Sequence, residues 1–357
     1  MRSSRYSISG RTSTQGLGVN RVEIRSSEFL RSVQSFGSIR VAVIGDVMLD
    51  IWLEGSVRRI SQEAPIPVVE LTGRKESPGG AANVAELLAS LGATVSLLGV
   101  VGQDDEASAL REAVRSTNIT ARFVGDAGRP TTTKTRVISG TQQICRLDVE
   151  DRSPAGPSVE SEMIEAVPEA LDGADAVIVS DYGKGTLTGK VVDAILSRTL
   201  VGEQPTVVDP NGPDATRYSR STILKPNRHE AFRALQLPFD QRTSTSKLAE
   251  ELKKMLDGCA VLVTDGANGM TLADEAGIYE IPAIGHAVVD VAGAGDAVSA
   301  MLALSLAAGH ELAMAAYCGN VAGAAAVLKR GTEPISISDI VSVLEKSSTS
   351  AKDMPQI

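Results

Sequence analysis

A glycine-rich segment that ends in an aspartate is the part of this sequence best suited to chemistry. It reads Asp290-Val-Ala-Gly-Ala-Gly-Asp296 and runs into the apolar residues 297–308. A glycine turn that opens a helix leaves backbone N–H groups unpaired, and the helix dipole adds positive charge there, so the site favours a phosphate. Asp296 could then act as a base, which indicates phosphoryl transfer to an alcohol. Ordinary capping of a helix is the alternative.

A second glycine motif, Pro78-Gly-Gly-Ala-Ala-Asn83, precedes another predicted helix. The paired glycines allow the backbone to approach a ligand closely. The Asn83 amide can both donate to and accept from hydroxyl groups, as sugar binding requires. A plain helix cap with tight packing is the alternative.

Short buried strands alternate with helical segments along most of the chain. Strand patterns fall at 41–44, 94–100, 176–180, 206–209, 222–224 and 261–264, and helical patterns at 81–91, 106–114, 191–200, 228–235 and 247–256. This alternation predicts an α/β fold with a mostly parallel sheet flanked by helices on both faces. Ligands bind where the carboxyl ends of such strands meet. The polar residues expected at that edge are Asp46, Asp50, Asp181, Asp209 and Asn227.

Two segments interrupt the alternation, at about residues 51–73 and 131–149. They lack helical periodicity and are rich in β-branched residues, so they predict a small β-sheet inserted as a lid. Residues 139–141, Ser-Gly-Thr, are predicted to form a hairpin turn in the second segment.

Basic residues lie on the predicted lid. Lys134 and Arg136 share one strand face by the two-residue period, and Arg146 lies on the predicted partner strand. Together these side chains could hold an anion. A solvated strand face is the alternative.

Composition limits the class of partner. The chain has 357 residues, of which 43% are hydrophobic, and a formal net charge of −9. The charge disfavours nucleic acid and anionic membranes as partners. No segment approaches the length of about 18 apolar residues that a membrane span needs. Three cysteines without paired spacing favour a reducing, cytoplasmic location.

The two ends of the chain differ from its middle. Residues 1–26 are dominated by Ser, Thr, Gly and Arg without periodicity, which predicts a disordered extension. An organellar transit peptide is the alternative. We expect one domain over residues 27–345, with the lid inside it, and a C-terminal tail over residues 346–357.

Four motifs resemble, in order and spacing, those of the ribokinase-like carbohydrate kinases. They are Gly45-Asp-Val-Met-Leu-Asp50, Gly79-Gly-Ala-Ala-Asn83, Lys225-Pro-Asn-Arg-His-Glu230 and Gly293-Ala-Gly-Asp296. The resemblance runs from about residue 27 to about residue 343 and implies a ribokinase-like fold that uses ATP and Mg²⁺. Three further strings, at 60–69, 141–148 and 179–185, resemble the D-glycero-D-manno-heptose-7-phosphate kinases. That subgroup phosphorylates the anomeric hydroxyl to give the 1,7-bisphosphate.

The resemblance implies a role for each matching residue. Asp296 is the catalytic base, and Gly293, Ala294 and Gly295 form the anion hole for the transferred phosphate. Mg²⁺ is placed by Asn227 and, through water, by Glu230, while Asp290 is a candidate ligand for a monovalent cation such as K⁺. The residues implied in substrate binding are Asp46, Asp50, Gly79, Gly80, Asn83, Lys134, Arg136, Arg146, Asp181 and Lys184. The residues implied in nucleotide binding are Lys225, Asn227, Glu230, Asp265, Gly266 and Asn320.

The chain departs from the subgroup at three positions. Ala292 and Ala297 stand where the subgroup has threonines, and Asn211 stands where it has a lysine. A kinase for another sugar phosphate or a nucleoside therefore stays open, as does a non-catalytic sugar or nucleotide sensor on the same fold. No His-x-Gly-His signature occurs, so we expect no nucleotidyltransferase half. The resemblance also implies a homodimer formed through the lid, with a sugar phosphate and ATP as its small-molecule partners.

Overall fold

The computed structural model describes residues 19–21, 33, 35–114, 116–285 and 288–350. Its larger sheet has ten strands. They are β1 (Val19–Arg21), β2 (Arg40–Gly45), β5 (Thr94–Val101), β6 (Ile119–Gly125), β9 (Ala176–Ser180), β10 (Thr206–Asp209), β11 (Ile223–Leu224), β12 (Ala260–Thr264), β13 (Met270–Ala273) and β14 (Ile278–Ile281). The strand order is β1-β14-β13-β12-β11-β10-β9-β2-β5-β6. All neighbours pair in parallel except β12 with β13 and β13 with β14.

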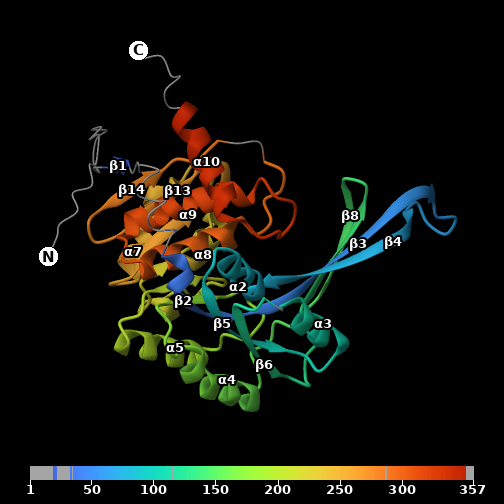
Figure 1. The fold of residues 1–357 in the computed structure, drawn as a ribbon, viewed down its shortest axis with the longest axis horizontal. Helices are drawn as coiled ribbons and strands as arrows, with labels where there is room; N and C mark the ends of the chain where they lie inside the picture. The colour runs from blue at the N-terminus through green and yellow to red at the C-terminus, as the bar shows by residue number, and fades with distance from the viewer. Residues whose placement is uncertain (1–18, 22–32, 34, 115, 286–287, 351–357) are drawn as a thin grey trace.

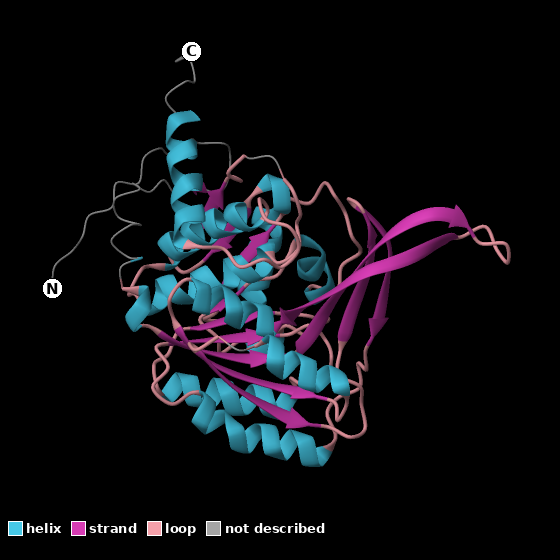
Figure 2. Ribbon diagram, turned by 45° about the vertical axis from the view of Figure 1, so that its right-hand side comes forward, coloured by secondary structure: helices cyan, strands magenta, loops and turns pink. Residues whose placement is uncertain are grey.

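Helices cover both faces of this sheet, as Figure 2 shows. They are α2 (Ala81–Ser90), α3 (Asp105–Ala113), α4 (Pro157–Ala170), α5 (Gly189–Val201), α6 (Arg228–Ala234), α7 (Thr245–Met255), α8 (Ala294–Ala307), α9 (Leu312–Ala326) and α10 (Ile337–Ser350), with short 3-10 helices at Phe36–Ser38, Thr216–Tyr218 and Gly266–Asn268. The two-residue period of β2 shows how the layers form. Val41 and Val43 belong to the same hydrophobic cluster as residues of α2, α8 and α9, whereas Ala42 and Ile44 belong to the cluster of α4, α5 and α7. The predicted α/β fold with helices on both faces is confirmed.

The lid is a separate four-stranded sheet in the order β4-β3-β7-β8. Its strands are β3 (Val47–Ile60), β4 (Pro67–Gly80), β7 (Thr133–Ser139) and β8 (Gln142–Val149). Figure 1 shows β3 and β4 projecting from the body as a long ribbon. The predicted turn at residues 139–141 is present, with Gly140 at a positive φ of 62°. The lid strands are longer than expected because β3 begins directly after Asp46 and β4 runs into the Gly79-Gly80 pair.

A secondary-structure element lies across or beyond the expected domain boundary at each end. Residues 19–21 fall in the segment predicted to be disordered, yet they form β1, because the edge of β14 offers unpaired backbone groups to a passing strand. The other residues of segment 1–26 lie outside the described residues. At the other end α10 continues past residue 345 to Ser350, and residues 351–357 lie outside the described residues.

Several elements were not anticipated from the sequence, namely β6, β13, β14, α4, α9 and α10. The strands β13 and β14 have four residues each, too few for a period of two to stand out. Helix α9 is apolar on most sides because it is buried, so it lacks the amphipathic pattern of a surface helix. None of the described helices combines the length and apolar character that crossing a membrane requires.

Candidate active site

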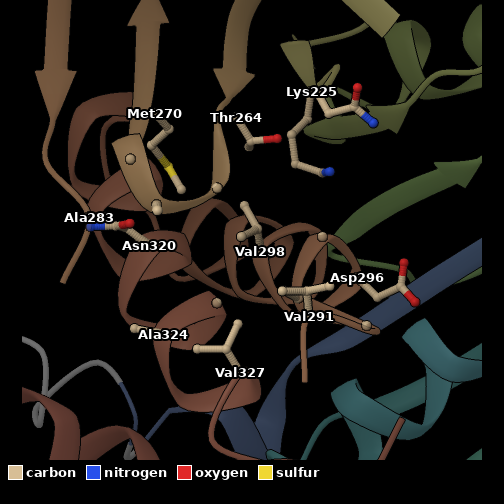
Figure 3. Close-up of a pocket in the computed structure, with 18 of the residues that line it drawn as sticks. Lys225, Thr264, Met270, Ala283, Val291, Asp296, Val298, Asn320, Ala324 and Val327 are labelled. Carbon is tan, nitrogen blue, oxygen red and sulfur yellow. The ribbon is translucent and has the colours of Figure 1, made fainter. Parts of the chain in front are cut away.

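A cavity of about 550 Å³ opens at the carboxyl edge of the sheet, beside the N-terminus of α8. One end is polar, and Figure 3 shows Lys225 and Asp296 there. The opposite end is apolar and includes Met270, Ala324 and Val327 (Figure 3). The other polar residues that line the cavity are Asp181, Tyr182, Asp209, Asn211, Asn227, Glu230, Thr264 and Asn320. A cavity with one apolar and one charged end suits a nucleotide.

Asp296 lies in the first turn of α8 and is only 6% exposed. Asn83 Nδ2 donates to its Oδ2 at 2.5 Å, and the Tyr182 hydroxyl donates to its Oδ1. Burial, with a smaller contribution from the Asp209 carboxylate, raises the pKa of Asp296 to about 6, although the hydrogen bonds from Tyr182 and Asn83 and the charge of Lys225 act in the opposite direction. A carboxylate with such a pKa is ionised at neutral pH and is still a useful base.

The backbone before Asp296 has the glycine turn that the predicted anion hole requires, which itself stays a prediction; one of its N–H groups, that of Ala294, donates to the Val291 carbonyl at 3.4 Å. Gly293 begins α8 in the left-handed region with φ 74°, and a Cβ there would lie 3.3 Å from Asn83 Nδ2. A glycine is therefore required at this position. The helix N-terminus presents its N–H groups beside the Asp296 carboxylate, which is the arrangement that favours a bound anion.

Lys225 supplies a cation at the same place. Its Nζ lies 3.0 Å from Asp209 Oδ2 and 3.6 Å from where a Cβ on Gly295 would stand. Burial alone would lower the pKa of Lys225, but the carboxylates of Asp209, Glu230 and Asp296 outweigh it and raise that pKa above its ordinary value. The buried side chain is therefore a permanent ammonium at the end of the helix dipole.

Asn227 and Glu230 form a capping box at the start of α6. Asn227 Oδ1 accepts from the Glu230 N–H at 3.0 Å, and Glu230 Oε2 accepts from the Asn227 N–H at 2.8 Å. Burial and the nearby Asp209 raise the pKa of Glu230. Among the described residues no group of three or more His, Cys, Asp or Glu side chains could hold a metal. Asn227 and Glu230 offer amide and carboxylate oxygens, the type of ligand taken by Mg²⁺, which also keeps several waters and binds phosphate oxygens.

The glycine pair meets Asp50 beside Asn83. A Cβ on Gly79 would lie 2.8 Å from Asp50 Oδ2, and a Cβ on Gly80, which has φ 57°, would lie 2.4 Å from the Asp46 carbonyl oxygen. Asp50 is 3% exposed, and Arg136 Nη1 donates to its Oδ1 at 2.7 Å. Burial raises the pKa of Asp50, and Arg136 partly offsets this. The structure thus brings the predicted hydroxyl-binding residues together around Asn83, which contacts Asp296.

The cations predicted to bind substrate, three on the lid and Lys184 after β9, are all paired with carboxylates. Lys134 Nζ lies 3.3 Å from Asp148 and 3.7 Å from Glu150, and Lys184 Nζ lies 2.5 Å from Glu150. Arg146 Nε lies 2.8 Å from Asp148 Oδ1. A ligand anion would have to exchange with these carboxylates, so an anion-binding role for Lys134, Arg136, Arg146 and Lys184 stays a prediction.

Asp46 does not line the cavity, and neither do the other predicted substrate residues Asp50, Gly79, Gly80 and Asn83, so its contact with substrate stays a prediction. Its Oδ2 accepts from the N–H groups of Tyr182 at 2.8 Å and Lys184 at 3.0 Å, and its Oδ1 accepts from Thr186 N–H at 3.2 Å. These amide contacts occupy the carboxylate because β2 ends beneath the loop of residues 181–186. Asp46 therefore holds that loop in place.

Asp181 does line the cavity and is also tied to the protein. Its Oδ1 accepts from Gly183 N–H at 2.7 Å, and its Oδ2 accepts from the Tyr218 hydroxyl. Burial, together with the neighbouring Asp46 charge, raises the pKa of Asp181 to about 6. Its place at the end of β9 agrees with the strand-end expectation.

The predicted nucleotide residues separate into two groups. Gly266 and Asn320 line the cavity, and Asn320 Nδ2 donates to the Pro282 carbonyl at 2.8 Å. Asp265 lies outside it and pairs with Arg228 Nη1 at 2.8 Å. Asp290 also lies outside, where its two oxygens each accept a backbone N–H at 3.0 Å, from Ala292 and Gly331. Cation binding by Asp290 stays a prediction.

Two of the departures from the subgroup differ in their place relative to the cavity. Ala297 is fully buried in the core, so a hydroxyl there would not face the cavity. Asn211 lines the cavity, where its Oδ1 accepts from Arg233 Nη1 at 3.3 Å. With Lys225 at the polar end, this region keeps a positive charge although position 211 is neutral.

The sequence reasoning did not single out Tyr182 or the apolar lining. Tyr182 directly follows Asp181 at a strand end, a position that the strand-end rule could have flagged. The apolar lining comes from residues far apart in the chain, and no local pattern marks them. They are Met270, Ala283, Ile284, Val288, Val291, Val298, Ala324 and Val327.

Known proteins resemble this chain in sequence and in fold. A sequence model described as pfkB family carbohydrate kinase matches residues 38–339. The chain is 40% identical over 311 residues to a bifunctional protein HldE of Caulobacter vibrioides and 41% identical over 310 residues to one of Azorhizobium caulinodans. Each match covers 86% of this chain, but the chain spans only 64% of each relative. Phosphofructokinase-2 from Escherichia coli in complex with potassium shares the fold at 20% identity, with a TM-score of 0.71 over 87% of this chain and 99% of that one.

Replacing Asp296 with Asn should not weaken the fold at pH 7.5. The folded-state pKa of about 6 lies above the ordinary 3.8, so the charged form disfavours folding at pH values above about 6. We expect Asp296→Asn to raise the free energy of unfolding by about 1–3 kcal/mol at pH 7.5, and this gain should shrink as the pH falls toward 4. Urea titrations at both pH values measure it.

Asp46→Asn is the matched control at the same edge of the sheet. Its carboxylate accepts from three amides, so the substitution should lower the free energy of unfolding by about 2–4 kcal/mol. Equal destabilisation by the two substitutions at pH 7.5 would contradict the assignment of Asp296 as a buried charge that lowers the free energy of unfolding.

Proposed function

Since the chain belongs to the pfkB family of carbohydrate kinases and is a sugar kinase, we propose that it transfers the γ-phosphate of ATP to the anomeric hydroxyl of D-glycero-D-manno-heptose 7-phosphate, giving the 1,7-bisphosphate. The observation that carries the chemistry is the position of Asp296. Its carboxylate lies at the N-terminus of α8, between Asn83 on one side and the Lys225 end of the cavity on the other.

The transfer needs a base and a stabilised phosphate. Asp296 accepts the proton of the acceptor hydroxyl as that oxygen attacks phosphorus, and the bond from phosphorus to the departing ADP oxygen breaks. The N–H groups of Gly293, Ala294 and Gly295 and the Lys225 ammonium stabilise the charge on the transferred group. These donors are fixed in the fold, so little reorganisation is required at the moment of reaction.

The nucleotide is placed by the rest of the cavity. The apolar end receives the base of ATP, with Gly266 and Asn320 at its wall, and the phosphates extend toward Lys225. Mg²⁺ held through water by Asn227 and Glu230 would neutralise charge on the phosphates. Asp290 is our candidate ligand for K⁺, an idea supported by the potassium complex of phosphofructokinase-2.

The choice of acceptor is supported by two observations. Identity of about 40% to proteins named HldE extends over the lid, where an acceptor would be recognised. The substrate side also carries Lys134, Arg136, Arg146 and Lys184, which suits an acceptor that already bears a phosphate. The neutral Asn211 leaves another sugar phosphate as the second candidate. We place the reaction in the cytoplasm, consistent with three free cysteines.

A panel of acceptors tests the substrate. ADP formation should depend on D-glycero-D-manno-heptose 7-phosphate, and phosphorus NMR should show a new anomeric phosphate in the product. Fructose 6-phosphate, ribose and adenosine are the comparison acceptors. Faster turnover of any of these would replace the heptose assignment, and tight binding of ATP without transfer to any acceptor would favour a sensor.

The pH dependence tests the base. Activity should fall as the pH drops through about 6, because protonated Asp296 cannot accept the acceptor proton. Asp296→Asn should lower kcat by about a thousandfold, within the range that general bases contribute, and leave the KM for ATP within a few-fold. An active Asp296→Asn enzyme would assign the base elsewhere.

We propose further that two chains pair through their lids. The strand β8 is an edge of the lid sheet, and two of its apolar side chains, Leu147 and Val149, are 55% and 51% exposed. On β3 and β4, at the other side of the lid sheet, Ile60 and Leu71 are also more than half exposed. Exposed apolar residues beside an open strand edge favour association with a second copy.

Charges on β8 should separate such a dimer. The double substitution Leu147→Asp with Val149→Asp is expected to halve the mass measured by light scattering, since two carboxylates would be buried in the interface. Val201→Asp is the control, because Val201 is 87% exposed on α5, away from the lid. A wild-type mass of one chain, or no change in the double variant, would refute lid pairing.

A further inference from the structure

Tyr182 contacts the carboxylate of Asp296 from the side opposite to Asn83. Its hydroxyl donates to Oδ1, whereas Asn83 Nδ2 donates to Oδ2. Asn83 lies in the first turn of α2, directly after the glycine pair that meets Asp50, so the Oδ2 that it contacts is on the side of the residues assigned to the acceptor. We propose that Tyr182 is a positioning residue that holds Oδ1 of Asp296, so that Oδ2 is the oxygen that meets the acceptor hydroxyl.

The tyrosine is itself fixed at its backbone. The Tyr182 N–H donates to Asp46 Oδ2 at 2.8 Å, and the same carboxylate binds the amides of Lys184 and Thr186 further along the loop. The side chain lines the cavity, with its hydroxyl on Asp296. Asp46 and Tyr182 thus form a chain of contacts from the end of β2 to the base. Such support from surrounding residues keeps a catalytic group in its productive geometry.

Charged residues on other elements shift the pKa of Asp296 in opposite directions. Asp209 from β10 brings a like charge, and Lys225 after β11 brings an opposite one, itself paired with Asp209 at 3.0 Å. Glu230 from α6 acts on Lys225 and Tyr182. Burial and the nearby carboxylates raise the pKa of Tyr182 well above its usual range, so its hydroxyl keeps its proton and donates across the working pH range.

Removal of the hydroxyl has a defined consequence. The Tyr182 hydroxyl donates to the ionised carboxylate of Asp296 and so lowers the pKa of Asp296. Without it, burial and Asp209 still raise that pKa, and only Asn83 and Lys225 lower it. Asp296 then holds its proton to a higher pH. The carboxylate also loses the contact that fixes its rotation about the Cβ–Cγ bond, so fewer bound acceptors meet Oδ2 in line.

The inference rests on the proposed function, and Tyr182→Phe tests it. We expect kcat at pH 6.5 to fall at least tenfold, the acidic limb of the kcat profile to move upward by about one pH unit, and part of the loss to be recovered at pH 8.5. KM for ATP should stay within twofold. Substrate phosphates also titrate near pH 6, but their pKa values do not change between variants, so the displacement between the two profiles is decisive.

Tyr218→Phe is the matched control. Tyr218 is also buried and its hydroxyl also donates to a carboxylate, but that carboxylate belongs to Asp181. The control should leave the acidic limb in place whatever it does to kcat. A Tyr182→Phe profile that superimposes on the wild-type profile, or equal displacement in both variants, overturns the proposal.

A second measurement does not depend on turnover. With ¹³C-labelled aspartate, the Asp296 carboxyl signal, identified by its loss in Asp296→Asn, can be titrated directly by NMR. Its midpoint should be higher in Tyr182→Phe than in wild type and unchanged in Tyr218→Phe. A wild-type protein that phosphorylates none of the acceptors would refute the proposed function, whereas an unchanged Asp296 midpoint in Tyr182→Phe would refute the role of Tyr182 alone.

Discussion

Three carboxylates share one buried ammonium, and the rest of the site depends on that arrangement. Asp209, Glu230 and Asp296 all act on Lys225, which is almost fully buried. Charges removed from water are costly unless they are paired, and here three negative groups surround one positive group. The excess of negative charge suits a site that receives Mg²⁺. The N-terminus of α8, at the same place, suits a phosphate. The fold tolerates this local cost because two apolar cores on either side of the sheet stabilise the elements that carry these residues.

Parallel strands explain how distant residues meet. Asp181, Asp209 and Lys225 each follow or end a strand, and those strands are neighbours in the sheet. Alternating buried strands and helices are visible in the sequence, so this convergence could be predicted. The capping box of Asn227 with Glu230 and the glycine that opens α8 could also be predicted, because each depends on residues within one helical turn. Local chemistry of this kind leaves a local signature.

Contacts across the fold left no such signature. Tyr182 meets Asp296 over 114 positions, and Arg136 meets Asp50 over 86. Strand register decides whether a lid cation faces the ligand or pairs with a carboxylate of the protein. In the lid, the pairing of β7 with β8 has an irregularity after Val137. Asp46 looked like a ligand for substrate because it follows a strand. In the structure its carboxylate accepts from three amides, since the next loop passes directly over the end of β2. The sequence therefore predicted that the carboxyl edge of the sheet is polar, but not which of its polar groups already form hydrogen bonds within the protein.

The base of the lid is joined to the body through Trp52. A Cβ on Gly331, in the turn that follows α9, would lie 2.6 Å from the indole ring, and the guanidinium of Arg136 lies 4.8 Å from the ring centre on its way to Asp50. The Gly331 N–H is in turn bonded to Asp290, at the start of the segment that leads into α8. If the lid moves about its base, the turn at Gly331 must move with it, or the contact between Gly331 and the Trp52 indole must break. Any opening of the lid that leaves this turn in place would thus begin with a loss of packing at the indole ring of Trp52.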